Sequence, residues 1–426
     1  MATGAATRPG GKQLRIAAAC VLVYFFTNGM ALFVPQNLFP RFMESFAASP
    51  AEVSRTTAIT FGVAGLLAPF VGAAIDRLGV VRVIRAGLLV LGLTFAAYPA
   101  ARSLSDLYLL HGVIALGLIL AGLMPNVVLL SRWFSTHRGT AVGVLVAGSS
   151  LAGAVLPLSI SPLVNDPAFG WRFGMGALAV AFWLFAVLPG FLVLAEPGPA
   201  ASRAGAGPPP PVDGVSFATA LRSRTLWCLA VGSACLWFAI QAMTSQITIY
   251  FEEEAGLAPA RATTLYATIL ACSVAGKFLF GAVSDRFRKQ RVMVATSITL
   301  LAGCLLLFTA GGNGAGADGA GGVVGLARDP VQLTAFAVIF GLGFGGSFTL
   351  IQLVAVESFG QLALGRILGI VTFVDTMGGA AGTLLAGQLR TATGDYFVTF
   401  TVVVVVALVA LGNVLLIRPV ARITNA

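Results

Sequence analysis

A lone lysine in an apolar stretch is the residue of this sequence with the clearest capacity for chemistry. Lys277 lies in the segment 262–283, where every other residue is uncharged. A helix through that segment would hold an ammonium inside the hydrocarbon of a membrane, at a cost of about 2.5–3.5 kcal/mol. Asp285 lies about 12 Å further along such a helix, beyond the reach of the lysine side chain toward the headgroups. We therefore expect Lys277 to be a functional, cavity-facing lysine, with a structural ion pair as the alternative.

Asp375 is likewise an ionisable residue inside an apolar segment, and it is the only acidic residue well inside the segment 361–390. A buried carboxylate is a candidate for proton uptake. Uncharged polar residues in other apolar segments are candidates for substrate contact, with hydrogen bonding between helices as the alternative. These candidates are two pairs whose members can lie on one face of a helix, Asn28 with Gln36 and Gln241 with Ser245, together with Asn126 and Gln352.

No pattern in the sequence indicates an enzyme. All five cysteines lie inside apolar runs without the spacing of metal ligands, and no nucleophile with a base or phosphate-binding loop is recognisable. We expect no catalytic residue, metal or cofactor. A membrane-embedded enzyme or a nutrient receptor stays open on hydropathy alone, and solute flux in proteoliposomes would decide.

The composition identifies a polytopic membrane protein. Of 426 residues, 58% are hydrophobic and only 10% are charged, whereas soluble domains carry about 25% charged residues. The net charge of +10 comes from short basic clusters between apolar runs, and no nucleic-acid-binding signature accompanies it. We attribute this charge to membrane orientation and expect no nucleic-acid partner.

Apolar segments long enough to cross about 30 Å of hydrocarbon predict an all-α fold of twelve transmembrane helices. The predicted helices span 14–37, 53–75, 80–101, 105–130, 138–164, 171–195, 226–250, 262–283, 290–310, 331–356, 361–390 and 395–417.

Arg and Lys are concentrated in the segments on the side of the two termini. By the positive-inside rule, both termini are predicted to be cytoplasmic, with the chain in the cell inner (plasma) membrane. On the opposite side, the run Glu252, Glu253 and Glu254 is expected to be the solvated start of a loop.

Two low-complexity stretches interrupt the pattern. A Gly/Ala- and Pro-rich stretch at 198–214 predicts a linker between two halves, which gives a first bundle at 1–197, a linker at 198–225 and a second bundle at 226–426. A glycine-rich stretch at 311–322 is expected to be a disordered outer loop.

The two halves repeat a motif. Gly72 and Asp76-Arg77 recur as Gly281 and Asp285-Arg286, each at the end of the second helix of its half. An aspartate beside arginines can accept charge-assisted hydrogen bonds and pair with the adjoining helix. Gly72 and Gly281 are expected to let neighbouring backbones approach closely.

These motif turns, GAAIDRLG and GAVSDRFR, resemble the hallmark loop of the major facilitator superfamily. The resemblance to this superfamily covers the whole chain. The stretches SRWFSTHRGTAVGVLVAGSSLAG (131–153), GLGFGGSFTLIQLVAVESFG (341–360) and GQLRTATGDYFVTF (387–400) resemble the monocarboxylate porter and oxalate/formate exchanger group. The resemblance implies two pseudo-symmetric six-helix bundles that rock about a central site. It also implies gating by the charges at the motif turns, namely Asp76, Arg77, Asp285 and Arg286, with Arg138, Glu357 and Arg366 as weaker candidates.

Within this resemblance, Lys277 occupies the position of an arginine that binds the substrate carboxylate, although a lysine lacks the bidentate fork of arginine. Asp375 lies where the exchanger group carries a second substrate-binding lysine, so the charge is reversed. Two departures are Ser273, where animal monocarboxylate carriers have an acid, and Gln36, where they have a lysine. We expect Lys277 and Asp375 to neutralise each other until a carboxylate takes the lysine and Asp375 accepts a proton.

The sequence therefore predicts a monomeric secondary transporter that carries a small carboxylate with a proton by alternating access. Exchange of anions, as in oxalate/formate carriers, and proton-driven export of a drug or metabolite are the alternatives. An Asp375-centred site for a cationic or zwitterionic substrate also stays open.

Overall fold

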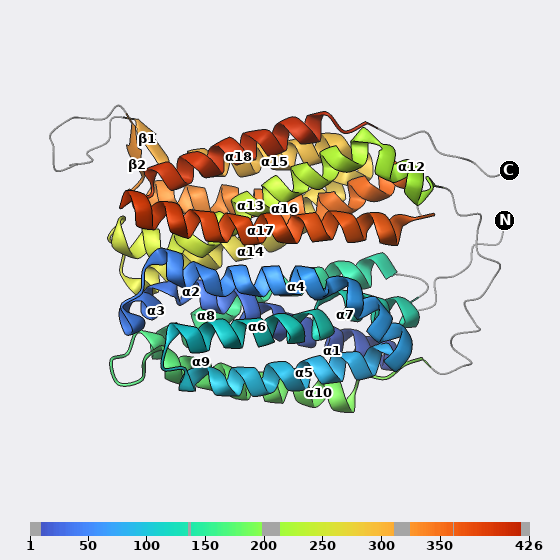
Figure 1. The fold of residues 1–426 in the computed structure, drawn as a ribbon, viewed down its shortest axis with the longest axis horizontal. Helices are drawn as coiled ribbons and strands as arrows, with labels where there is room; N and C mark the ends of the chain where they lie inside the picture. The colour runs from blue at the N-terminus through green and yellow to red at the C-terminus, as the bar shows by residue number, and fades with distance from the viewer. Residues whose placement is uncertain (1–9, 135–137, 198–213, 311–323, 361, 419–426) are drawn as a thin grey trace.

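Two helical bundles lie side by side in the computed structural model, which describes residues 10–134, 138–197, 214–310, 324–360 and 362–418 (Figure 1). The first bundle is blue to green and the second is yellow to red. The elements of the first bundle are α1 (Gly11–Asn28), the π-helical η1 (Gly29–Phe33), α2 (Val34–Asn37), α3 (Phe39–Phe46), α4 (Pro50–Leu78), α5 (Val80–Ala97), the 3-10 turn η2 (Tyr98–Ala100), α6 (Leu104–Ala121), α7 (Leu123–Trp133), α8 (Arg138–Val164), α9 (Gly170–Phe182), the π-helical η3 (Trp183–Val187) and α10 (Leu188–Leu192).

The described part of the second bundle contains six long helices, one short helix and a small hairpin. Its elements are α12 (Phe217–Arg222), α13 (Arg224–Glu253), α14 (Pro259–Arg286), α15 (Lys289–Leu305), β1 (Phe308–Ala310), β2 (Val324–Leu326), α16 (Pro330–Phe359), α17 (Leu364–Thr393) and α18 (Phe397–Leu415). Together the bundles confirm the predicted all-α membrane fold. Eleven helical segments of the described chain are long and apolar enough to span a membrane, and α15, with 17 residues, corresponds to the remaining predicted segment, 290–310.

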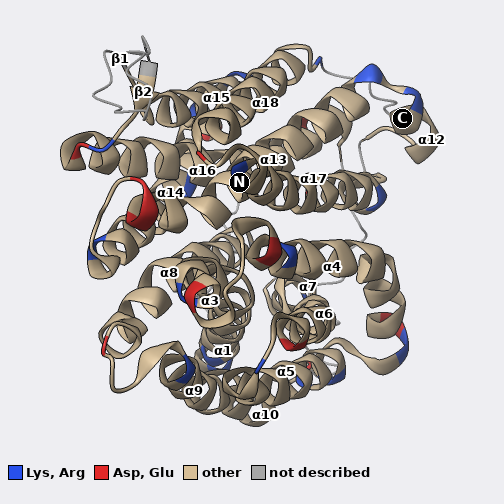
Figure 2. Cartoon of the chain, turned by 60° about the vertical axis from the view of Figure 1, so that its left-hand side comes forward, with Lys and Arg blue, Asp and Glu red and all other residues tan. Residues whose placement is uncertain are grey.

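Charged residues gather near the helix ends and leave most of each helix uncharged (Figure 2). The start of α1 and the end of α18 lie at one end of the molecule, which we call the terminal end (Figure 1). The opposite end, the remote end, carries α3 and the β1–β2 hairpin. This distribution is typical of helices that cross a hydrocarbon layer and have their charged ends in water on both sides.

Local capping chemistry sets where the α4 helix begins and ends. The Ser49 hydroxyl accepts from the Glu52 backbone N–H, and the Glu52 carboxylate accepts from the Ser49 N–H at 2.9 Å, which is a reciprocal capping box. At the other end, Gly79 takes a φ of +85° that other residues rarely adopt. The helix therefore spans the bundle from the remote end to the motif turn.

One predicted helix is two helices. The segment predicted as 105–130 breaks at Gly122 into α6 and α7. The Asn126 side chain donates to the carbonyl oxygens of Ala121 and Gly122 at 2.8 and 2.7 Å, so it binds backbone carbonyls that the break releases. The prediction missed the break because the segment stays apolar across it.

The hairpin and the linker also differ from the sequence prediction. β1 and β2 pair antiparallel, with Phe308 opposite Leu326. No strand was expected there, and β1 replaces the end of the predicted helix 290–310. The glycine-rich stretch between the strands lies outside the described residues. Within the predicted linker, α12 is helical, and the backbone N–H of Val215 donates to the Phe359 carbonyl at 2.9 Å. The end of the linker is therefore attached to the second bundle.

Close helix packing relies on glycines other than the motif pair. A Cβ at Gly345 would collide with the Ser273 carbonyl oxygen, and a Cβ at Gly276 with that of Leu342, so these glycines bring α14 and α16 together. In contrast, no packing neighbour among the described residues lies within 4 Å of a Cβ built at Gly72, and at Gly281 the nearest such atom is 3.9 Å away. The predicted close approach at the motif glycines is therefore wrong for this conformation.

Candidate functional site

Lys277 lies on α14, where it faces the other bundle, and is only 7% exposed. Its Nζ donates to the Val146 carbonyl oxygen at 2.9 Å and to the Ser150 hydroxyl at 2.8 Å, with the Ser149 hydroxyl at 3.4 Å. All three acceptors belong to α8 of the first bundle. The ammonium is therefore a direct tie between the two bundles, not a lipid-facing group.

The groups around this ammonium are neutral. None of the ion pairs in the described part of the chain includes Lys277. The Ser150 hydroxyl also lies 3.1 Å from that of Ser273, and the Phe348 ring centroid lies 4.8 Å from Nζ. Dipoles and an aromatic face stabilise a cation less than a carboxylate does. No acid among the described residues therefore neutralises the positive charge of Lys277.

Asp375 lies on α17 and is 8% exposed. Its Oδ1 has no hydrogen-bond partner among the described residues. The side chain lines a cavity of about 120 Å³ that both bundles form. The other lining residues are Phe61 and Leu123 of the first bundle and Trp237, Phe348, Ile351, Gln352, Leu368, Val371, Thr372 and Thr376 of the second.

The expected ion pair between Lys277 and Asp375 is not formed in this conformation. The lysine extends toward α8 of the first bundle, whereas the aspartate lines the cavity. Hydrogen bonds to Val146 and Ser150 already occupy the ammonium. Phe348 connects the two charged groups, because its ring lies beside the ammonium and also lines the cavity.

Of the uncharged residues proposed for substrate contact, Gln352 lines the cavity beside Asp375. Gln36 is buried, and its Oε1 accepts from the Tyr266 hydroxyl of the second bundle at 3.2 Å, while its Nε2 has no partner among the described residues. Asn28 is partly buried in α1. Only Gln352 therefore lies next to the cavity.

The remaining polar candidates make local contacts. Asn126 caps the break between α6 and α7, as described above. The Gln241 side chain accepts from the Thr244 hydroxyl at 3.4 Å and packs against Gly379. The Ser245 hydroxyl donates to the Ala242 carbonyl at 3.2 Å. In this conformation these groups stabilise helices and their packing.

The predicted gating residues lie at the terminal end. Asp76, Arg77, Asp285 and Arg286 are exposed, and none of them belongs to an ion pair within the described ranges. The backbone N–H of Lys289 donates to the Glu357 carboxylate at 3.1 Å, and the Arg366 guanidinium lies 5.9 Å from the Phe217 ring centroid. The Arg138 side chain lies outside the described residues. The motif charges therefore do not join the bundles here.

Among the described residues, the ion pair that joins the two bundles lies at the remote end, where sequence reasoning placed a solvated loop. Arg41 of α3 pairs with Glu252 in the last turn of α13, and the two side chains are 24% and 13% exposed. The Gln246 side chain donates to the Ser54 hydroxyl of α4 at 2.7 Å. We call Arg41, Glu252, Ser54 and Gln246 the latch.

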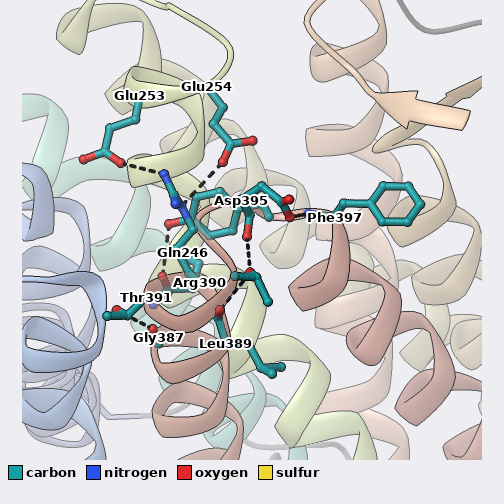
Figure 3. Close-up of polar contacts among 11 residues, drawn as sticks. Gln246, Glu253, Glu254, Gly387, Leu389, Arg390, Thr391, Asp395 and Phe397 are labelled. Carbon is teal, nitrogen blue, oxygen red and sulfur yellow. Dashed lines mark hydrogen bonds and ion pairs between the residues drawn. The ribbon is translucent and has the colours of Figure 1, made fainter. Parts of the chain in front are cut away.

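The other two glutamates of the acidic run hold α13 to α17 behind the latch. Arg390 lies between Glu253 and Glu254, with a nitrogen–oxygen distance of 3.4 Å to each (Figure 3). Its guanidinium also lies 5.0 Å from the Tyr396 ring centroid. Burial raises the pKa of Glu254 above its ordinary value, and Arg390 opposes this shift. The prediction of a solvated loop start is therefore wrong for Glu252 and Glu254, whereas Glu253 is exposed.

A signal for this cluster was present in the sequence. Three consecutive glutamates at the end of a helix require cations nearby when they are packed. The predicted helices 14–37, 53–75 and 361–390 place Arg41 and Arg390 on that same side of the membrane. Their pairing depends on contacts between residues that are 211 and 137 positions apart, which spacing alone does not reveal.

Comparisons with known proteins agree with this architecture. The family model described as Major Facilitator Superfamily matches residues 21–326 and 262–425. Monocarboxylate transporter 11 of Mus musculus is 26% identical over 92% of this chain and 84% of its own length. Agnestins efflux protein AgnL12 of Paecilomyces divaricatus is 26% identical over 63% of this chain, which spans about half (55%) of that protein.

A solved structure shows the same fold. The bacterial homologue of the human lysosomal transporter Spinster, in an inward-facing and occupied conformation, superposes with a TM-score of 0.71. The identity is 15%, and the alignment covers 96% of this chain and 95% of that one. With the family model matching nearly its whole length, this chain belongs to the major facilitator superfamily, whose members are multi-pass membrane transporters and not enzymes.

Proposed function

We propose that this protein is a secondary active transporter for small monocarboxylates and that Lys277 binds the substrate carboxylate. The observation that carries the proposal is the buried ammonium at the interface, whose contacts within the described part of the chain are all with neutral groups. A buried cation without a carboxylate partner is costly, so an anion that reaches it gains a strong, charge-assisted hydrogen bond.

Substrate binding at this lysine would change how the bundles are held together. A carboxylate that accepts from Nζ competes with the Val146 carbonyl and the Ser150 hydroxyl, which are both on the opposite bundle. Occupation of the site would therefore loosen a central tie between α14 and α8. That is the differential contact a ligand needs to shift an equilibrium between two conformations.

Asp375 is our candidate for the proton that accompanies the substrate. Its side chain lines the interbundle cavity, and its buried Oδ1 has no hydrogen-bond partner among the described residues, so this oxygen can accept a proton. Moving a monoanion against 100 mV costs about 2.3 kcal/mol, and a co-transported proton cancels that charge. The absence of a contact between Asp375 and Lys277 means that a proton and an anion can bind at separate points.

We further propose that the terminal end is cytoplasmic and that this conformation opens to that side. The positive-inside rule supports the orientation. The latch joins the bundles at the remote end, while the motif charges are exposed at the terminal end. In the opposite conformation, Asp76, Arg77, Asp285 and Arg286 would take over the joining role. The chain needs no second copy for this cycle, so we expect a functional monomer.

Export of an organic metabolite is the second candidate, and the largely apolar lining of the cavity favours it. The similarity to a fungal efflux protein points the same way. Exchange of two anions, as oxalate/formate carriers perform, would also use Lys277, but it would need no protonatable group at Asp375.

Flux in proteoliposomes separates these proposals. We expect an inward-directed proton gradient to drive accumulation of labelled lactate or a related acid by the wild type. Asp375→Asn should abolish the response to the proton gradient and leave exchange of internal for external acid. The exposed Asp329→Asn serves as a matched control. Uptake by Asp375→Asn that still follows the proton gradient would exclude the proposed proton role.

A further inference from the structure

The cavity beside Asp375 has a lining that a very small acid would not use. Seven of its lining side chains are apolar, and three of those, Phe61, Trp237 and Phe348, are aromatic. Its volume of about 120 Å³ is comparable to the ~150 Å³ apolar cavity that binds benzene. The cavity therefore has room for one ring-sized apolar group.

The three aromatic side chains form a connected wall across the two bundles. The Trp237 and Phe348 ring centroids lie 5.7 Å apart with an interplanar angle of 74°, and those of Phe61 and Trp237 lie 6.5 Å apart at 54°. Each of the three is only partly buried. Aromatic rings prefer such edge-to-face and tilted contacts, so a further ring in the cavity would extend the wall.

The charged groups restrict what this ring is attached to. Phe348 lines the cavity and its ring also lies 4.8 Å from the Lys277 ammonium. Lys277 itself is not among the residues that line the cavity, so an acid whose ring packs against Phe348 needs a short chain to bring its carboxylate to that ammonium. Lys277 is the only basic residue of the segment 262–283, and a single ammonium matches one carboxylate better than two.

We propose that the substrate is an arylalkanoate, a monocarboxylic acid with an aromatic ring on a short aliphatic chain. The ring packs in the cavity against the side chains of Phe61, Trp237 and Phe348, and the carboxylate binds Lys277. This proposal rests on the proposed function, because it assigns the body of the acid whose carboxylate that function places at the lysine. Formate, oxalate and lactate have no ring that could pack against these three aromatic side chains.

The test is a binding panel on the purified, full-length protein, measured by isothermal titration calorimetry. The panel contains benzoate, phenylacetate and phenylpropionate, with hexanoate as an apolar acid without a ring and lactate as a small acid. Phenylalanine and phenethylamine test zwitterionic and cationic ligands. We expect the best aryl acid to bind about tenfold or more tighter than lactate, because it buries a ring, and tighter than hexanoate.

Variants then locate the ring. Trp237→Leu should weaken aryl acids about three- to tenfold and leave lactate unchanged, while the exposed Trp227→Leu on the same helix should alter neither. Phe61→Leu provides an independent test from the other bundle if Trp237→Leu does not fold. Equal effects of the two tryptophan variants, with Phe61→Leu also silent, would refute the ring site.

The outcomes separate this inference from the function it rests on. If acids bind through Lys277 but hexanoate or lactate equals the aryl acids, the aromatic substrate class is wrong and carboxylate transport stands. If no acid binds, or if phenethylamine binds best, both are wrong. If phenylalanine binds tighter than phenylpropionate, the ring site stands and the monocarboxylate assignment is wrong.

Discussion

Removing the charge of Glu252 should open the remote end of the protein. Glu252 forms the latch ion pair with Arg41, and the two side chains are 13% and 24% exposed. Exposed pairs contribute about 0–1 kcal/mol, and loss of one partner of a fully buried pair costs about 3–5 kcal/mol. We therefore expect Glu252→Gln to shift the equilibrium by about 1–2 kcal/mol, or about 5- to 30-fold, toward the conformation open at that end.

Spin labels at the remote end measure this shift directly. Exposed positions Ser105 on α6 and Ala260 on α14 belong to different bundles, and labels there would report the separation by double electron–electron resonance. The background would have the five native cysteines replaced by alanine. We expect Glu252→Gln to increase the long-distance population.

Glu44 supplies the matched control for the latch. It also pairs with Arg41, at 3.4 Å, but it lies on the same helix and is 74% exposed. Glu44→Gln makes the same chemical change to a partner of the same arginine without touching the interface between the bundles. Identical distance distributions for Glu44→Gln and Glu252→Gln would refute the assignment of Glu252 to the latch.

Two further predictions concern packing and pH. Gly345→Ala should destabilise the protein by about 1–3 kcal/mol, because its Cβ would collide with the Ser273 carbonyl, whereas Gly281→Ala should be tolerated; equal melting temperatures would contradict this. Burial raises the pKa of Glu254 against the opposing effect of Arg390. Its ionisation therefore costs the folded state, so its contribution to stability is complete below the unfolded pKa of about 4.3 and falls as pH rises through the higher folded pKa. Thermal scans of Glu254→Gln should show a smaller decline of Tm over that window than the wild type, and equal declines would contradict the assignment.

Helices and their order were predictable from the sequence because hydropathy and length dominate inside a membrane. The break between α6 and α7 was not, since Gly122 and Leu123 continue an apolar run and the side chain that binds the released carbonyls, Asn126, looked like a substrate contact. The motif glycines Gly72 and Gly281 were assigned a packing role from their residue type. Whether a glycine is crowded depends on the neighbouring helix, which the local sequence does not specify.

The site was predictable in part. Lys277 and Asp375 stand out as charges in apolar segments, but sequence could not say what they contact. The partners of the lysine are Val146 and Ser150, neutral groups on a helix that lies 131 and 127 residues earlier in the chain. Many hydroxyls and carbonyls in the sequence were equally possible, whereas an acid was the simplest electrostatic expectation.

The latch is the clearest case of information that only the fold supplies. Glu252 ends a helix at the membrane boundary, where an exposed acid needs no partner, and Arg41 is equally ordinary for its position. They form an ion pair because the fold brings α3 and α13 together at the remote end. In the same structure the motif charges at the terminal end are exposed. Of the two sets of charged groups, the latch therefore joins the bundles and the motif charges do not.

Carboxylate binding by Lys277→Gln, measured by calorimetry against the wild type, tests the central claim most directly. Truncating one partner of a buried charge pair costs about 2–5 kcal/mol, so we expect affinity for the best acid of the panel to fall by about 30-fold or more. Lys277→Arg should keep part of the affinity because it keeps the charge, and Lys289→Gln, at the start of α15, should keep all of it. Unchanged acid affinity in a folded Lys277→Gln protein would contradict the account.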